Sequence, residues 1–155
     1  MAHSYIYTKN SKTERTIAVT DSLLHVFMCF FNESINKAEL SKEQTEICNH
    51  YVYELDAMNT SFIDLKLQEI YDNDQLLNWY SSTLLKLKSI IDPYGKAIDH
   101  GIINELPKLK KKFVRPLDTN RLKNLVNDIF WILNKENAIP SEDFNWFEDP
   151  LSKYY

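Results

Sequence analysis

Glycine is nearly missing from this sequence, since only Gly95 and Gly101 occur among its 155 residues. Loops that cradle phosphate groups need several glycines, because the backbone must approach the ligand closely. These two glycines supply neither a GxGxxG fingerprint nor a P-loop. Tight β-hairpin turns also favour glycine. The scarcity therefore counts against nucleotide-binding α/β folds and against all-β folds.

Cysteine and long apolar runs are scarce too. Cys29 and Cys48 are too few for a disulfide framework, and both lie among apolar residues, as buried thiols do in a reducing compartment. The longest apolar run, 23–31, is interrupted by His25 and would span only about 14 Å as a helix, far less than a bilayer. The first twelve residues are polar and lack the apolar stretch of a secretory signal. These features predict a soluble, cytoplasmic protein.

The remaining composition is that of an ordinary globular domain, with 44% hydrophobic and 26% charged residues. A chain of this length suits one domain, which we expect to span residues 1–155. The net charge of −4 is mildly acidic. Because general nucleic-acid and anionic-membrane binders carry basic surfaces, we expect neither kind of partner. The charge permits an acidic face that meets a basic protein.

Helix start signals and apolar stripes of helical period recur along nearly the whole sequence. Capping boxes at 11–14 and 41–44 predict helices over 12–36, which a second start signal at Thr20-Asp21 would divide, and over 41–58. Further helices are predicted over 62–72, from Asp72-Asn73-Asp74 to Pro93, over 94–106, between Pro107 and Pro116, and from Asp118-Thr119 to 137. The sequence therefore predicts an all-α, single-domain bundle of six or seven helices with an irregular aromatic and acidic C-terminal tail.

No local signature of catalysis or metal binding appears. Glu-x-x-His, HExxH and Cys-x-x-Cys motifs are absent, and Cys48 and His50 are two residues apart, which places them on different sides of a helix. We therefore expect no metal and no cofactor. An enzyme remains an alternative, with His50 paired to Glu46 at i,i+4 spacing, or His100 paired to its neighbour Asp99.

A basic stretch supports another alternative, a nucleic-acid-associated or regulatory helical protein that contacts phosphate groups. Its cations are Lys108, Lys110, Lys111, Lys112, Arg115, Arg121 and Lys123. Only one aromatic residue, Phe113, interleaves them, so bases would find little to stack on. A solvated helix face explains such a stretch equally well.

The segment SEDFNWFEDP, residues 141–150, packs four acids and three aromatics into ten positions. Trp131 lies opposite the apolar stripe of the last predicted helix and needs a cover or a partner. In one interpretation the tail folds back over Trp131. In the other, Trp131 and the tail aromatics form a binding patch, while the acids steer a basic partner inward.

Acidic residues at 72–74 and at 43–46 could extend or replace that patch. The predicted partner-binding residues are Trp131, Glu142, Asp143, Phe144, Trp146, Phe147, Glu148, Asp149, Asp72 and Asp74.

In general character the whole chain resembles the small bacterial immunity proteins of contact-dependent inhibition and polymorphic toxin systems. The resemblance lies in a small, acidic, aromatic-rich helical chain without catalytic motifs, and it assigns no functional residue. It implies a non-enzymatic antitoxin that blocks the active site of a basic toxin domain, often a nuclease. A net charge of only −4 then requires that the acids gather on one face.

Overall fold

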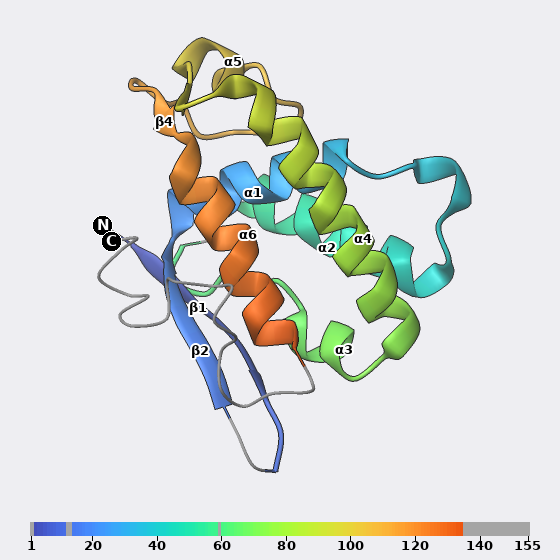
Figure 1. Ribbon diagram of the computed structural model, residues 1–155. Helices are drawn as coiled ribbons and strands as arrows, with labels where there is room; N and C mark the ends of the chain where they lie inside the picture. The colour runs from blue at the N-terminus through green and yellow to red at the C-terminus, as the bar shows by residue number, and fades with distance from the viewer. Residues whose placement is uncertain (1, 12–13, 59, 135–155) are drawn as a thin grey trace.

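Two antiparallel strands precede Asp21, and the second of them occupies positions at which the sequence predicts the start of a helix over 12–36. In the computed structural model, which describes residues 2–11, 14–58 and 60–134, β1 (His3–Lys9) pairs antiparallel with β2 (Glu14–Thr20) (Figure 1). A second short pair joins β3 (Ala97–Ile98) to β4 (Leu117–Asp118). The all-α prediction is therefore wrong, and the fold is mixed α/β.

The alternation of β1 explains both the hairpin and the weakness of its signal. Ser4, Ile6 and Thr8 are buried, whereas Tyr5 and Tyr7 between them are exposed. Aromatic and β-branched residues favour such a half-buried strand. Because two of the three buried side chains are polar, the alternation of apolar and polar residues is blurred. Glu14, the last residue of the apparent capping box at 11–14, begins β2 instead of a helix.

Four long helices lie where the start signals and apolar stripes predict them. They are α1 (Asp21–Glu33), α2 (Lys42–Ala57), α4 (Asp74–Ile91) and α6 (Thr119–Leu133). Ser41 and Gln44 form the predicted capping box of α2. The side chains of Asn73 and Asp118 accept hydrogen bonds from the first turns of α4 and α6. Each cap satisfies backbone donors that have no partner within the helix.

The other predicted helices are shorter or do not form. The structure has α3 (Leu67–Tyr71) and α5 (His100–Asn104), with single 3-10 turns at η1 (Lys37–Glu39) and η2 (Asp92–Tyr94). Residues 60–66 are held outside α3 by bonds to other elements. Gly95, at φ 72°, turns the chain after η2 so that residues 97–98 can pair with β4. The stretch 107–116 is irregular rather than helical.

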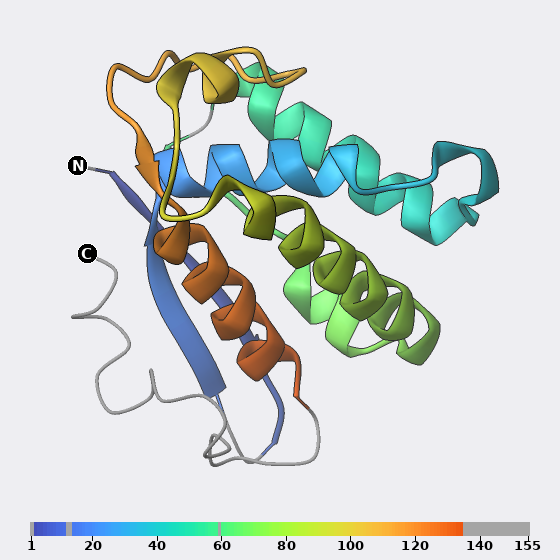
Figure 2. The same ribbon diagram turned by 45° about the horizontal axis from the view of Figure 1, so that its top comes forward.

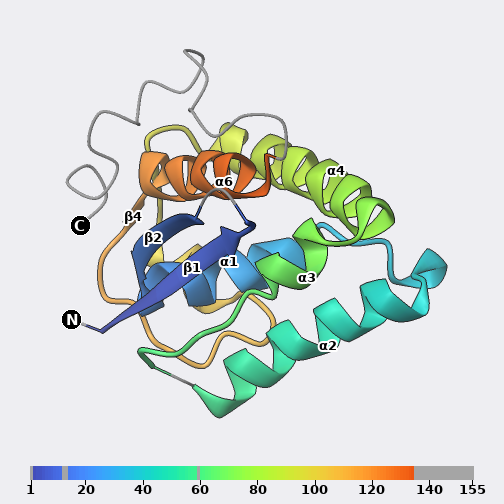
Figure 3. The same ribbon diagram turned by 90° about the horizontal axis from the view of Figure 1, so that it is seen from below.

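Helix α1 occupies the centre of the molecule, as its broad apolar circumference predicts. It packs against α2 on one side and against α4 and α6 on the other (Figure 3). Helix α6 also covers the buried face of the hairpin. Within the described ranges, no helix is long and apolar enough to cross a membrane.

An aromatic cluster around Phe31 joins α1 to its neighbours. The Phe31 ring lies 5.3 Å from the ring of Tyr51 on α2 and 4.7 Å from that of Tyr80 on α4. The two tyrosine hydroxyls are fully buried and 2.6 Å apart. Tyr51 donates to the carbonyl oxygen of Leu65, so Tyr80 donates to Tyr51. Burial is the first cause that raises the pKa of both hydroxyls, which keeps them protonated.

This chain of hydroxyls predicts unequal effects for two matched substitutions. Tyr80→Phe removes only the terminal donor and should cost about 1 kcal/mol of unfolding free energy. Tyr51→Phe leaves the Leu65 carbonyl and the Tyr80 hydroxyl buried without this partner, and should cost about 2–4 kcal/mol. Urea denaturation of both variants measures the difference. Equal destabilisation would show that the Tyr51 hydroxyl does not have this linking role.

Candidate functional site

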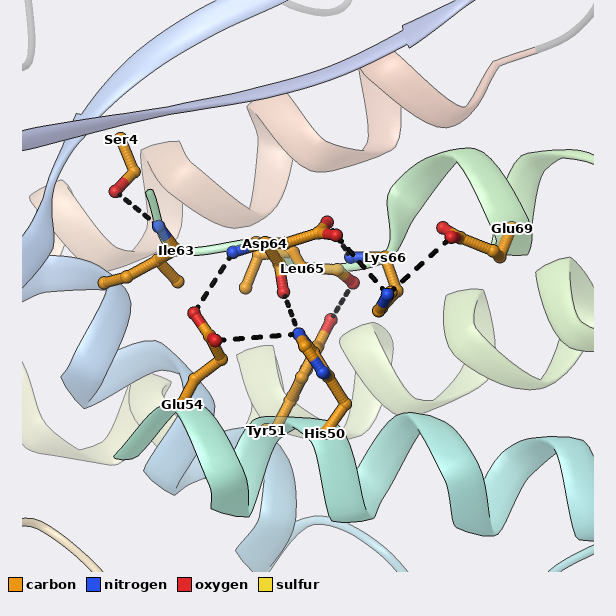
Figure 4. Close-up of polar contacts among 9 residues, drawn as sticks. All are labelled: Ser4, His50, Tyr51, Glu54, Ile63, Asp64, Leu65, Lys66 and Glu69. Carbon is orange, nitrogen blue, oxygen red and sulfur yellow. Dashed lines mark hydrogen bonds and ion pairs between the residues drawn. The ribbon is translucent and has the colours of Figure 1, made fainter. Parts of the chain in front are cut away.

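The 60–66 segment crosses between β1 and α2 and is fixed by side chains rather than by a sheet (Figure 4). Ser61 and Lys66 have φ values of 69° and 61°, in the left-handed region that side chains disfavour. Such backbone persists only where the surroundings determine it, and it clusters at functional sites. The groups that hold this segment therefore determine what it places at the surface.

Asp21 and Ser4 hold the start of the segment. The buried Asp21 carboxylate accepts bonds from the Ser4 hydroxyl, at 2.6 Å, and from the Ser61 amide, at 2.7 Å. The Ser4 oxygen in turn accepts from the Ile63 amide at 3.0 Å. The first turn of α1, strand β1 and the 60–66 segment are thus tied at one buried point.

Helix α2 holds the rest of the segment. The buried Glu54 carboxylate accepts from the Asp64 amide at 3.2 Å, and His50 Nε2 donates to the Asp64 carbonyl at 2.9 Å. The Tyr51 hydroxyl adds its bond to Leu65. Three side chains one to four positions apart on α2 therefore grip consecutive residues of the segment. Its end is fixed relative to α2, and so is the start of α3.

An acidic groove of ≈ 320 Å³ lies where α2, α3 and the start of α4 meet. Its floor is apolar, formed by Ile47 and Leu76, which are 5% and 6% exposed. Its rim carries Glu43, Glu46 and Glu69, and it is completed by Lys66 and Asn73. An apolar floor below converging carboxylates suits a long basic side chain, whose stem is apolar and whose end is charged.

Lys66 is the cation of this rim, and it is already engaged. Its Nζ lies 3.5 Å from Asp64 Oδ2 and 3.9 Å from Glu69 Oε1 (Figure 4). These partly exposed pairs are weak, because water screens them. The carboxylates of Glu43 and Glu46 stand on the opposite wall, on exposed positions of α2. The groove thus keeps an excess of negative charge.

A second hollow of ≈ 200 Å³ adjoins the groove through their shared residue Glu69. Tyr5 and Tyr7 line it from β1, together with Asp64 and Gln68. The tyrosine side chains are 66% and 46% exposed. Exposed tyrosine beside carboxylates is typical of protein interfaces, since the ring buries a large area at little entropic cost. Helix α3, which carries the shared residue Glu69, lies between β1 and α2 (Figure 3).

The structure brings together two acidic spots that the sequence places far apart. Asp72 follows α3 and Asp74 begins α4, on either side of the groove residue Asn73. Both aspartates are exposed. The Glu43–Glu46 stretch forms the facing wall. The two predicted acidic spots therefore belong to one surface, here called the acidic face, made of the groove, the adjoining hollow and these aspartates.

Trp131 lies on a different part of the molecule. It is half-buried near the end of α6, and the Arg15 guanidinium of β2 stacks 5.4 Å from its ring. The same guanidinium donates to the carbonyls of Trp131 and Asn134, at 2.6 and 2.7 Å. The hairpin therefore supplies a cover that the sequence did not suggest. Its predicted companions lie outside the described residues, namely Glu142, Asp143, Phe144, Trp146, Phe147, Glu148 and Asp149.

Of the two candidate catalytic histidines, His100 lies beside its predicted partner Asp99, whereas His50 lies beside a carboxylate other than the predicted Glu46. His50 lies 3.9 Å from Glu54, on the side away from the predicted partner Glu46. His100 Nδ1 lies 3.3 Å from Asp99 Oδ1 on a largely exposed turn. Neither ring lines the acidic groove. Among the residues that the structure describes, no group of three or more histidine, cysteine or acidic side chains is arranged to hold a metal ion.

The basic stretch lies at the far end of α2 from the groove. Lys110 pairs with Asp56 at 3.9 Å, and Lys111 donates to the hydroxyl of Ser22. The segment between α5 and β4 accordingly runs past the C-terminal end of α2 and the start of α1 (Figure 2). The acidic groove and the basic stretch thus lie at opposite ends of α2, which a net charge of −4 does not reveal.

Sequence reasoning missed Lys66, Glu69 and the two tyrosines of β1. Tyr5 and Tyr7 carried a usable signal, because aromatic residues two apart, with Ile6 between them, are typical of an exposed strand face. Glu69 carried no such signal. It joins the site only because the 60–66 segment turns α3 toward α2.

The chain matches no protein-family model, and no curated protein or solved structure is significantly similar to it. The functional inference therefore depends on the geometry of the acidic face.

Two glutamates of α2 test whether the 60–66 segment depends on its side-chain anchors. Glu54→Ala should cost about 1–3 kcal/mol, because the Asp64 amide loses its acceptor. Glu46→Ala, an exposed position on the same helix, should change stability by no more than about 0.5 kcal/mol. Urea denaturation measures both, and amide hydrogen exchange of residues 61–66 should accelerate only in Glu54→Ala. Similar values for the two variants would contradict the anchoring role.

Proposed function

We propose that this protein is a non-enzymatic protein-binding module, an immunity protein or antitoxin of the cytoplasm that binds a basic toxin domain. The observation that carries the proposal is the acidic groove, in which carboxylates from α2 and α3 converge above an apolar floor. The toxin would insert a lysine or arginine side chain there. If the toxin is a nuclease, that side chain is one that otherwise contacts phosphate, and the complex occludes the active site.

In this proposal, charge and shape make separate contributions to binding. The carboxylates steer a basic partner and accelerate its association. Tyr5 and Tyr7 supply contact area beside the groove. The 60–66 segment fixes the groove before the partner arrives, so little conformational entropy is lost on binding. Preorganisation of this kind suits an inhibitor, whose task is tight occupancy rather than turnover.

Neutralising the groove tests the site against a matched control. The triple variant Glu43→Gln/Glu46→Gln/Glu69→Gln should bind the toxin at least about tenfold more weakly, mainly through slower association. The control, Glu33→Gln/Glu39→Gln/Glu105→Gln, has the same net charge but leaves the groove intact, and should bind normally. The partner is sought by co-expression with the products of adjacent genes, and binding is measured by surface plasmon resonance at two salt concentrations.

Three results bear on the proposal in that experiment. A stoichiometric complex that the groove variant weakens, and that protects cells from the toxin, supports it. A complex unaffected by the groove variant contradicts the assigned site. The absence of any complex with adjacent gene products contradicts the antitoxin function itself.

The C-terminal tail calls for a separate variant, because its predicted binding residues lie outside the described structure. Trp146→Ala/Phe147→Ala should weaken toxin binding without lowering the melting temperature if the tail aromatics contact the partner. A lower melting temperature with normal affinity would instead place these aromatics against the protein's own core. Thermal denaturation and binding are measured on the same preparation.

A further inference from the structure

The basic stretch forms a defined loop rather than a loose run of lysines. The Asn104 side chain donates to the Phe113 carbonyl at 2.8 Å and accepts from the Phe113 amide at 2.7 Å. This pair of hydrogen bonds closes the loop at the end of α5. Lys110 and Lys111 fasten its middle to Asp56 and Ser22.

The loop presents an apolar side chain between cations. Val114 is 83% exposed, and it stands between the exposed residues Lys112 and Arg115. No acidic residue occurs between positions 106 and 117. The loop therefore has an exposed apolar side chain flanked by positive charges. The acidic groove has the complementary arrangement, an apolar floor flanked by carboxylates.

The groove and the loop cannot meet within one molecule. Glu43 lies at the first turn of α2, and Asp56, the partner of Lys110, lies near its end. Thirteen residues of helix separate them, which is about 20 Å. The rigid helix α2 holds the two surfaces apart, and Figure 1 shows α5 and α3 at opposite ends of the molecule.

From this complementarity we infer that the basic loop 108–115 of one copy docks into the acidic groove of a second copy. Val114 faces the floor formed by Ile47 and Leu76, while Lys112 and Arg115 meet Glu43, Glu46 and Glu69. The contact is heterologous, because two different surfaces meet, so each bound copy offers a further groove and a further loop. It uses the groove of the proposed function, and a basic partner would compete with it.

Sedimentation velocity of the purified protein alone tests the inference. The weight-average sedimentation coefficient should rise with protein concentration at low salt, and this rise should vanish at high salt, which screens the charges. The charge-reversed groove variant Glu43→Lys/Glu46→Lys and the loop variant Lys112→Glu/Arg115→Glu should each remain monomeric. The control Lys37→Glu/Lys86→Glu, with the same charge change as the loop variant at other exposed positions, should still associate.

Mixing the two monomeric variants gives the decisive result. The charge-reversed groove variant keeps an intact loop, and the loop variant keeps an intact groove. An equimolar mixture should therefore form heterodimers and nothing larger. Monomers at every concentration of the unmodified protein would overturn the inference. So would association that survives in the loop variant, or a mixture that stays monomeric. None of these results bears on toxin binding, which is measured with the toxin present.

Discussion

The buried hydroxyl of Tyr51 is the interaction on which the rest of the structure most depends. It joins α2 to α4 through Tyr80 and to the 60–66 segment through the Leu65 carbonyl. Each of these groups is far from water, so each would cost free energy without its partner. The direction of α3 follows from this bond, because Lys66 and α3 begin directly after Leu65. The position of the groove therefore follows from the hydrogen bonds that satisfy buried polar groups in the core.

Buried polar side chains also explain which parts of the fold the sequence predicts. Helices α1, α2, α4 and α6 each combine a start signal with an apolar stripe, so local pattern and packing agree. The hairpin and the 60–66 segment instead bury Ser4, Thr8 and Asp21 among their contacts. From the sequence alone, such polar residues are expected at the surface. The hydrogen-bond partners that make their burial favourable lie 17 to 124 positions away.

The candidate site shows the same division. The acidic stretches at 43–46 and 72–74 are visible in the sequence, where they lead us to predict a basic partner. Their convergence is not visible, because it depends on the left-handed turn at Lys66 and on the hold of α2 on the segment before it. The cover of Trp131 is equally remote, since Arg15 is 116 positions away along the chain. Local patterns identify the chemistry, whereas tertiary contacts decide which pieces share a surface.

The acidic groove and the basic stretch lie at opposite ends of α2, and this placement has a physical consequence that the net charge hides. A partner that approaches from a distance meets an attractive end and a repulsive end, so it is oriented before contact. A basic domain would be drawn to the α3 end and repelled by the loop after α5, so the encounter would favour the face that holds the groove and the two tyrosines. In the proposed self-association, a second copy would compete for that face. Partner binding and self-association would then be alternative states, set by the concentration of the protein and by salt.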